Sequence, residues 1–143
     1  MKKIVGSILV VIILLSIGFL LLSNNETTLK AEDFGDVIDR SNVNEIEIIR
    51  SSDDKTIIIK EDQAEELYTE FLNAELKEAK NVDGALTEAY WITIREDGKR
   101  ALGIRMDTRL VLSPYDYSGN KKNSESYVVE DDSVLETIEQ LFK

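Results

Sequence analysis

Residues 89–107 read Ala89-Tyr-Trp-Ile-Thr-Ile-Arg-Glu-Asp-Gly-Lys-Arg-Ala-Leu-Gly-Ile-Arg-Met-Asp107. On both sides of Asp97-Gly98 the apolar side chains alternate with others, which is the pattern of a half-buried β-strand. A type I′ turn needs positive φ at both central positions, and Asp-Gly is among the pairs that supply it most readily. The stretch therefore predicts an antiparallel hairpin with strands over 89–95 and 101–107.

The alternation alone leaves open which face of this hairpin is buried. If Tyr90, Ile92 and Ile94 pack on a core, Trp91 lies on an uncovered face beside arginines, a composition that protein interfaces favour. The alternative is that Trp91 belongs to the core, or lies under a loop, and that Tyr90 faces solvent. We take six residues of this strand pair and the loop after it as candidate binding residues: Trp91, Thr93, Arg95, Arg105, Tyr115 and Tyr117.

Outward from the hairpin, the chain alternates strand and helix patterns separated by polar turns. Apolar residues at helical spacing predict helices, and two of these begin with a capping-box spacing, Asp62 with Glu65 and Ser133 with Glu136. Pro114 is expected to end the strand before it. The predicted helices cover 31–40, 62–73 and 133–142, and the further strands 43–50, 56–59, 74–80, 109–112 and 127–129.

Runs of adjacent strands joined by tight turns imply an antiparallel sheet, and amphipathic helices imply that one of its faces is covered. We therefore predict an α+β domain over residues 31–143, with an antiparallel sheet of about six to seven strands packed with amphipathic helices.

The N-terminal segment is of a different kind. Residues Ile4–Leu22 form an uncharged, strongly apolar run, and at about 1.5 Å per residue a helix of that length reaches roughly 28 Å, the thickness of a bilayer core. The run is longer than the apolar part of a secretory signal, and no small-x-small cleavage site follows it. We predict an N-terminal transmembrane helix, an anchor or uncleaved signal over residues 1–23; a cleaved signal is the alternative.

The charges that flank this segment give its direction. Lys2 and Lys3 precede it, whereas acidic residues follow it, and positive charge stays on the cytoplasmic side. We expect a single-pass cell-membrane protein with a cytoplasmic N-terminus, a tether over residues 24–30 and an extracellular domain.

Composition excludes several classes of function. The chain has 28 Asp and Glu against 17 Lys and Arg, a net charge of −11, and such a field repels nucleic-acid backbones. It contains no Cys and no His, which removes thiol and Ser–His catalysis as well as His- or Cys-built metal sites. We assign no catalytic residue, metal ligand or cofactor, and expect a protein that is not an enzyme.

Carboxylates leave two alternatives open. A pair of them could hydrolyse cell-wall glycan, although no pair stands out. Oxygen ligands could also make a calcium-responsive module. The candidate clusters for calcium are Asp53 with Asp54, the run 130–132, and the spacing Asp116-x-Ser118-x-Asn120.

A lysine-started apolar segment, a hairpin, a helix and the Tyr90–Gly98 stretch together resemble small membrane-anchored extracytoplasmic domains of unknown function from Gram-positive bacteria. The resemblance implies an envelope location and brings no activity or site residues. The leading hypothesis is a membrane-tethered, non-enzymatic binding domain whose partner is an envelope protein or another envelope component. The sequence does not indicate its oligomeric state.

Overall fold

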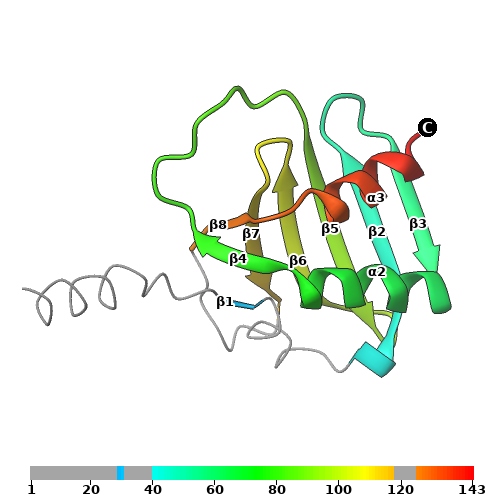
Figure 1. The fold of residues 1–143 in the computed structure, drawn as a ribbon. Helices are drawn as coiled ribbons and strands as arrows, with labels where there is room; N and C mark the ends of the chain where they lie inside the picture. Colours follow the sequence, from blue (N-terminus) through cyan, green and yellow to red (C-terminus); the bar gives the residue numbers. More distant parts are fainter. Residues whose placement is uncertain (1–28, 31–39, 118–124) are drawn as a thin grey trace, which may run out of the picture.

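The computed structural model describes residues 29–30, 40–117 and 125–143. They form one antiparallel sheet with two α-helices lying across one of its faces (Figure 1). The strands are β1 (Leu29–Lys30), β2 (Val43–Arg50), β3 (Thr56–Lys60), β4 (Glu75–Glu78), β5 (Ala89–Glu96), β6 (Lys99–Asp107), β7 (Val111–Asp116) and β8 (Tyr127–Val129), and the helices are η2 (Arg40–Asn42, 3₁₀), α2 (Asp62–Asn73) and α3 (Ser133–Leu141).

The eight strands lie in the order β1-β4-β8-β7-β6-β5-β2-β3. This confirms an antiparallel sheet packed with amphipathic helices; the eighth strand is the two-residue β1. Neighbours in sequence pair in the run from β5 to β8 and in β2–β3, whereas β2 with β5, β4 with β8 and β1 with β4 join distant parts of the chain. The predicted helix over 31–40 lies outside the described residues except for Arg40, which begins η2.

The predicted membrane anchor over residues 1–23 lies outside the part of the chain that the structure describes. Within that part, no helix combines the length and the apolar character needed to cross a membrane. The last two residues of the predicted tether form a strand, because Leu29 pairs with Leu76 and Lys30 with Glu75 at the edge of the sheet.

The hairpin of β5 and β6 has the predicted turn, with positive φ at both Asp97 and Gly98. This turn sets Glu96 opposite Lys99 and Arg95 opposite Arg100. An undisturbed ladder would continue with Ile94 opposite Ala101, which would turn Leu102, Ile104 and Met106 away from the core. A shift in register between Ile94 and Arg95 instead sets Ile94 opposite Leu102. The irregularity thus brings the apolar residues of both strands to one face.

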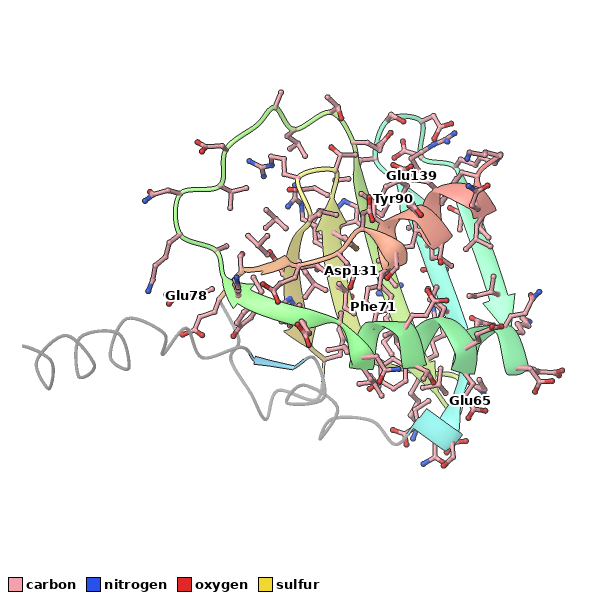
Figure 2. The ribbon with its side chains drawn as sticks, in the orientation of Figure 1. Glu65, Phe71, Glu78, Tyr90, Asp131 and Glu139 are labelled. Carbon is pink, nitrogen blue, oxygen red and sulfur yellow. The ribbon has the colours of Figure 1, made fainter. Side chains whose placement is uncertain are left out.

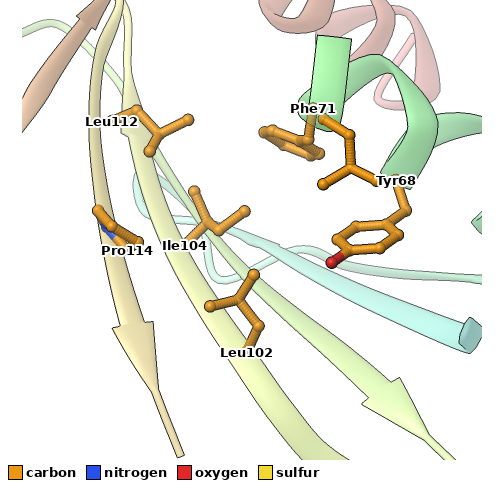
Figure 3. A pocket seen from close by; sticks show the side chains of 7 residues that line it. Tyr68, Phe71, Leu102, Ile104, Leu112 and Pro114 are labelled. Carbon is orange, nitrogen blue, oxygen red and sulfur yellow. The ribbon is translucent and has the colours of Figure 1, made fainter. Parts of the chain in front are cut away.

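The core lies between the helices and the sheet face that they cover. Phe71 of α2 and Tyr90 of β5 are buried there, while the acidic side chains of Glu65 and Glu78 point outward (Figure 2). A small apolar cavity of about 20 Å³ remains where α2 crosses β6 and β7 (Figure 3). It is lined by Tyr68, Phe71, Leu72, Leu102, Ile104, Leu112 and Pro114.

Neither predicted capping box forms. Helix α2 is preceded by Glu61, whose φ of 53° lets its carbonyl accept from the amides of Ala64 and Glu65, with no side-chain cap. Helix α3 follows Asp132, which also makes no side-chain cap, while the carboxylate of Asp131 accepts from the amide and the hydroxyl of Ser133. Both hydrogen bonds hold the pKa of Asp131 below its usual value. Neither helix therefore has the side-chain cap that the spacing predicted.

The prediction that Pro114 ends its strand was wrong, because β7 continues through it to Asp116. Pro114 lies opposite Ile104 of β6, but on its other side β7 pairs with β8 only at Val111 and Leu112. Beyond Leu112 that edge has no further ladder among the described residues. A residue without an amide hydrogen is tolerated at such an edge.

Candidate functional site

Within the described parts of the chain, both α-helices lie on one face of the sheet and none covers the opposite face, on which Trp91 lies. Trp91 is 54% exposed, whereas Tyr90 is 4% exposed and packs in the core. Of the two alternatives that the sequence left open, the structure has the one with Trp91 outside. The reason is the pleat: Tyr90, Ile92 and Ile94 join the inward-facing apolar residues of β6, which turns every odd-numbered residue from 91 to 95 outward.

The register of three strands gathers the outward side chains into two neighbouring rows. Trp91 lies opposite Arg105, which lies opposite Ser113. In the next row, Thr93 lies opposite Gly103, which lies opposite Tyr115. Together with the next outward aromatic, these residues form one surface, hereafter the Trp91 surface: Trp91, Thr93, Gly103, Arg105, Ser113, Tyr115 and Tyr117.

A depression of about 400 Å³ lies within the Trp91 surface. Gly103 sits in the middle of it and contributes no side chain between Thr93 and Tyr115. The ring of Tyr117 lies over this glycine: a methyl group there would come within 3.0 Å of its Cε2 and 3.2 Å of its hydroxyl. The missing side chain therefore leaves the space that the ring of Tyr117 occupies.

The two tyrosines of the surface support one another. Their ring centroids are 5.1 Å apart, with the rings at 77° in an edge-to-face arrangement, a geometry that aromatic pairs prefer. The backbone amide of Tyr117 donates to the carbonyl of Ala101, at 3.1 Å. These contacts fix two exposed phenol rings at the rim of the depression.

Arg105 connects the aromatic side chains to a buried acid. Its guanidinium lies 5.9 Å from the centre of the Trp91 ring, within the range of a cation–π contact. The same group donates through Nη1 to Oδ2 of Asp107, at 3.3 Å. Arg105 is thus held from one side by the carboxylate and lies against the indole on the other.

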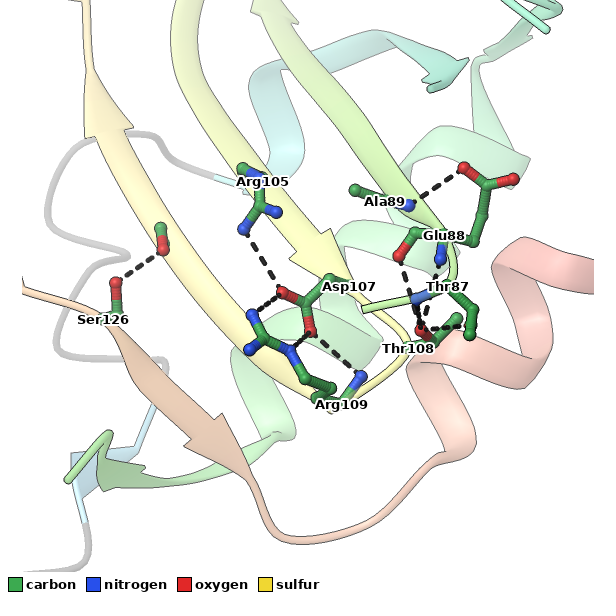
Figure 4. A network of polar contacts seen from close by, with 9 residues as sticks. Thr87, Glu88, Ala89, Arg105, Asp107, Thr108, Arg109 and Ser126 are labelled. Atoms are coloured by element: carbon green, nitrogen blue, oxygen red, sulfur yellow. Dashed lines mark hydrogen bonds and ion pairs between the residues drawn. The ribbon is translucent and has the colours of Figure 1, made fainter. Parts of the chain in front are cut away.

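Asp107 is the one buried charged side chain in the described part of the chain. Besides Arg105, it accepts from Nη2 of Arg109 at 2.8 Å and from the Arg109 amide at 3.0 Å (Figure 4). Burial by itself raises the pKa of this carboxyl, but the hydrogen bonds and charge of Arg109 outweigh it, so the pKa lies below its usual value. Asp107 is therefore a fixed anion that anchors both arginines.

Arg95, the sixth predicted site residue, does not belong to this surface. Its Nε lies 3.1 Å from Oε1 of Glu45 and its Nη2 3.9 Å from Oε2 of Glu47, both on β2. Lys60 of β3 also approaches Glu45, at 3.4 Å. The uncovered face thus has a part made of ion pairs over β2, β3 and the end of β5, and an aromatic part over β5, β6 and β7.

The positions of the acidic side chains are relevant to the two alternative functions that rely on carboxylates, glycan hydrolysis and calcium binding. The described residues that line the depression include no Asp or Glu. Elsewhere, Asp53 is paired with Arg50 at 2.6 Å, which lowers its pKa to about 2, and Glu130 is paired with Lys77 at 2.6 Å. Within the described ranges, Asp, Glu, His and Cys form no group of three that could hold a metal ion. Most of the spacing from Asp116 to Asn120 lies outside those ranges.

Ser113 and Asp107 were not among the residues that the sequence singled out. Ser113 stands beside Arg105 only because of the register between β6 and β7, and its hydroxyl lies 2.7 Å from that of Ser126. Asp107 reads as an ordinary turn residue, and its burial depends on how the 107–110 turn folds. The sequence signal for Asp107 is its position: it is a charged residue at the end of an alternating strand, and Arg109 follows two positions later.

Comparisons with known proteins add no relative: no family model matches the chain, and neither a curated protein nor a solved structure is detectably similar to it.

Proposed function

We propose that the protein is a non-enzymatic binding domain, tethered outside a cell membrane, that holds an envelope protein through the Trp91 surface. One observation carries this proposal: five of the six residues that the sequence singled out lie together around one depression on the uncovered sheet face. Tryptophan, tyrosine and arginine are the residues that dominate the energetics of protein interfaces.

The arrangement of the surface supports a protein partner. The surface combines the aromatic side chains of Trp91 and the two tyrosines with the guanidinium of Arg105 and the hydroxyl-bearing side chains of Thr93 and Ser113. Aromatic residues and arginine are enriched at protein interfaces. Edge-to-face packing and the Asp107 ion pairs hold Tyr115 and Arg105 before any partner arrives, which reduces the entropy lost on binding.

The proposed location follows from residues 4–22, which are long and apolar enough to form an anchor. The lysines before that run and the acidic residues after it favour a domain outside the cell. A partner reached through a short tether would then be another protein of the envelope.

The test is site-specific photocrosslinking in intact cells. A photoreactive residue placed at Thr93 of the full chain should give discrete adducts with an envelope protein. Adding Trp91→Ala should lower their yield at least about tenfold, because truncating a central aromatic anchor costs about 2 kcal/mol or more. Leu86→Ala is the matched control, since Leu86 is also 50% exposed but lies in the loop before β5.

A Trp91→Ala chain that keeps the wild-type thermal midpoint and every adduct would show that the surface is not the binding site. Fluorescence gives a second measurement, because Trp91 is the only tryptophan in the sequence. In the free protein its emission should be readily quenched by acrylamide. Adding the identified partner should shift the emission to shorter wavelength and protect it from the quencher.

A further inference from the structure

The sheet has a free edge at β3. Within the described residues, β3 pairs only with β2, and it stands at the end of the strand order; Figure 1 shows no element beyond it. The outer edge of such a strand presents amide and carbonyl groups that can pair with another strand.

Proteins usually protect such an edge, and β3 shows little protection. Its five residues are Thr56-Ile-Ile-Ile-Lys60, and its pairing with β2 has no irregularity that would bend it away. Ile58 is 51% exposed on the uncovered face. A regular apolar edge strand without proline or bulge is suited to pairing with a second strand.

We propose that β3 pairs with β3 of a second copy of this chain, antiparallel, about a two-fold axis at Ile58. In this register Ile58 faces its own copy, Ile57 faces Ile59, and Thr56 faces Lys60. One residue further out, Lys55 of one copy meets Glu61 of the other at both ends of the contact. Apolar residues thus meet apolar ones, and the terminal charges are opposite in sign.

The neighbouring registers are less favourable. Centring the axis on Ile57 would set Ile59 opposite Lys55. Centring it on Ile59 would set Ile58 opposite Lys60 and Ile57 opposite Glu61. Both place a charge against an isoleucine, which only the Ile58-centred register avoids. The strand ends at Lys60, and the next residue, Glu61, has a φ of 53°, so the pairing stops at the Lys55–Glu61 contact.

This pairing would join two sheets into one continuous sheet. Because a symmetric interface uses the same patch on both copies, it leaves the two Trp91 surfaces on β5 to β7 free. The proposed partner binding and the proposed self-association therefore use different strands. Each can fail without the other.

The test uses single cysteines, because the natural chain has none. Opposed residues in an antiparallel pair have Cα atoms about 4.5–5.5 Å apart, a distance that a disulfide spans. Oxidation of full-length Ile58→Cys in membranes should therefore give a disulfide-linked band of twice the monomer mass. Thr56→Cys is the matched control, since its sulfur would lie about 13 Å from its own copy, four residues along the strand.

Mixed chains test the register. Co-expressed Thr56→Cys and Lys60→Cys should give the dimer, while each alone should not. A dimer from Thr56→Cys alone, equal bands from all variants, no band from Ile58→Cys, or an Ile58→Cys adduct with a different protein would each overturn the proposal. Retained Thr93 photocrosslinks alongside a failed cysteine test would show that only the self-association is wrong.

Discussion

At the scale of single residues, Asp107 links the stability of the fold to the geometry of the Trp91 surface. Its carboxylate is fully buried at the end of β6 and accepts hydrogen bonds from Arg105 and Arg109. Leu110, which closes the turn after it, has a φ of 60°, and its amide donates to the carbonyl of Asp107 at 2.9 Å. A bulky residue in the left-handed region is held there by its surroundings.

We expect Asp107→Asn to lower the free energy of unfolding by about 1–3 kcal/mol, because a buried anion hydrogen-bonded to two cations is replaced by a neutral amide. Urea denaturation followed by circular dichroism measures the change. Asp83→Asn, in the exposed loop before β5, is the control and should leave the midpoint where it is. An equal midpoint for Asp107→Asn would refute the structural role of this anion.

Asp107→Asn should also change how the free energy of unfolding depends on pH. The pKa of Asp107 is lower in the folded protein than in the unfolded chain, so its contribution is complete at neutral pH and is lost as pH falls from about 4 through the folded pKa. The stability difference between wild type and Asp107→Asn should therefore be largest near pH 7 and shrink below about pH 4. A difference that stays constant down to pH 2 would contradict the direction of this shift.

Residue identity alone predicted part of the site. Trp91, Arg105, Tyr115 and Tyr117 were chosen because their side chains are typical of interfaces, and the structure brings them together with Thr93. Arg95 was also chosen, but it forms ion pairs with Glu45 and Glu47 on β2. The sequence did not indicate these contacts, because they depend on the pairing of β2 with β5, two strands far apart in the chain. Gly103 matters through the side chain that it lacks, so no property of the residue itself marks it.

At the scale of elements, the β5–β6 hairpin is the element whose turn conformation follows most directly from its own residues. Gly98 has a φ of 76°, and a methyl group added there would meet no atom within 4 Å. Gly98→Ala should therefore destabilise the protein by about 1 kcal/mol through backbone strain alone. Thermal denaturation measures this, and an unchanged midpoint would mean that the turn does not keep its left-handed residue.

Helix α2 is held to the sheet by its buried side chains. Phe71 is 2% exposed and lies over β6 and β7 beside the small cavity (Figure 3). Phe71→Ala should cost about 3–5 kcal/mol, the usual range for removing a buried ring. Glu66→Ala on the exposed side of the same helix should change the midpoint little. Similar losses for both would show that the helix packs in another orientation.

The positions of most elements followed from periodicity, and so did the bounds of α2, β2 and β8, but the starts of the helices' hydrogen bonding and the end of β7 did not. Helices over 62–73 and near 133–142 and the hairpin strands lie where alternation and helical spacing predicted them. The helix starts without side-chain caps and the continuation of β7 through Pro114 depend on backbone conformation and on which edge has a partner. Such features are decided by the folded neighbours rather than by the residue types.

At the scale of the whole molecule, the order of the strands in the sheet could not be predicted from the sequence. The last strand, β8, lies inside the sheet between β7 and β4. Val129 pairs with Leu76 and Val128 with Lys77, so β4 depends on a partner about fifty residues away. Polar turns mark where strands reverse, but nothing in β4 or β8 identifies them as partners.

A chain that ends at residue 126 should therefore not fold. It would lack β8 and α3, which leaves β4 paired only with the two residues of β1 and exposes the buried side chains under α3. Loss of near-ultraviolet circular dichroism and of a cooperative melt is the expected result. Removal of Lys143 alone is the control, and a cooperative transition in the shortened chain would refute the dependence on β8.

The inner position of β8 also has a consequence in time. A ribosome adding roughly 5–20 residues per second needs between about 2 and 10 s to advance from the end of β4 to the start of β8. During that interval β4 has been synthesised, and towards its end β7 as well, but the strand that joins them has not. Until β8 is made, the growing chain therefore carries strand edges without their partner, which can pair with other chains.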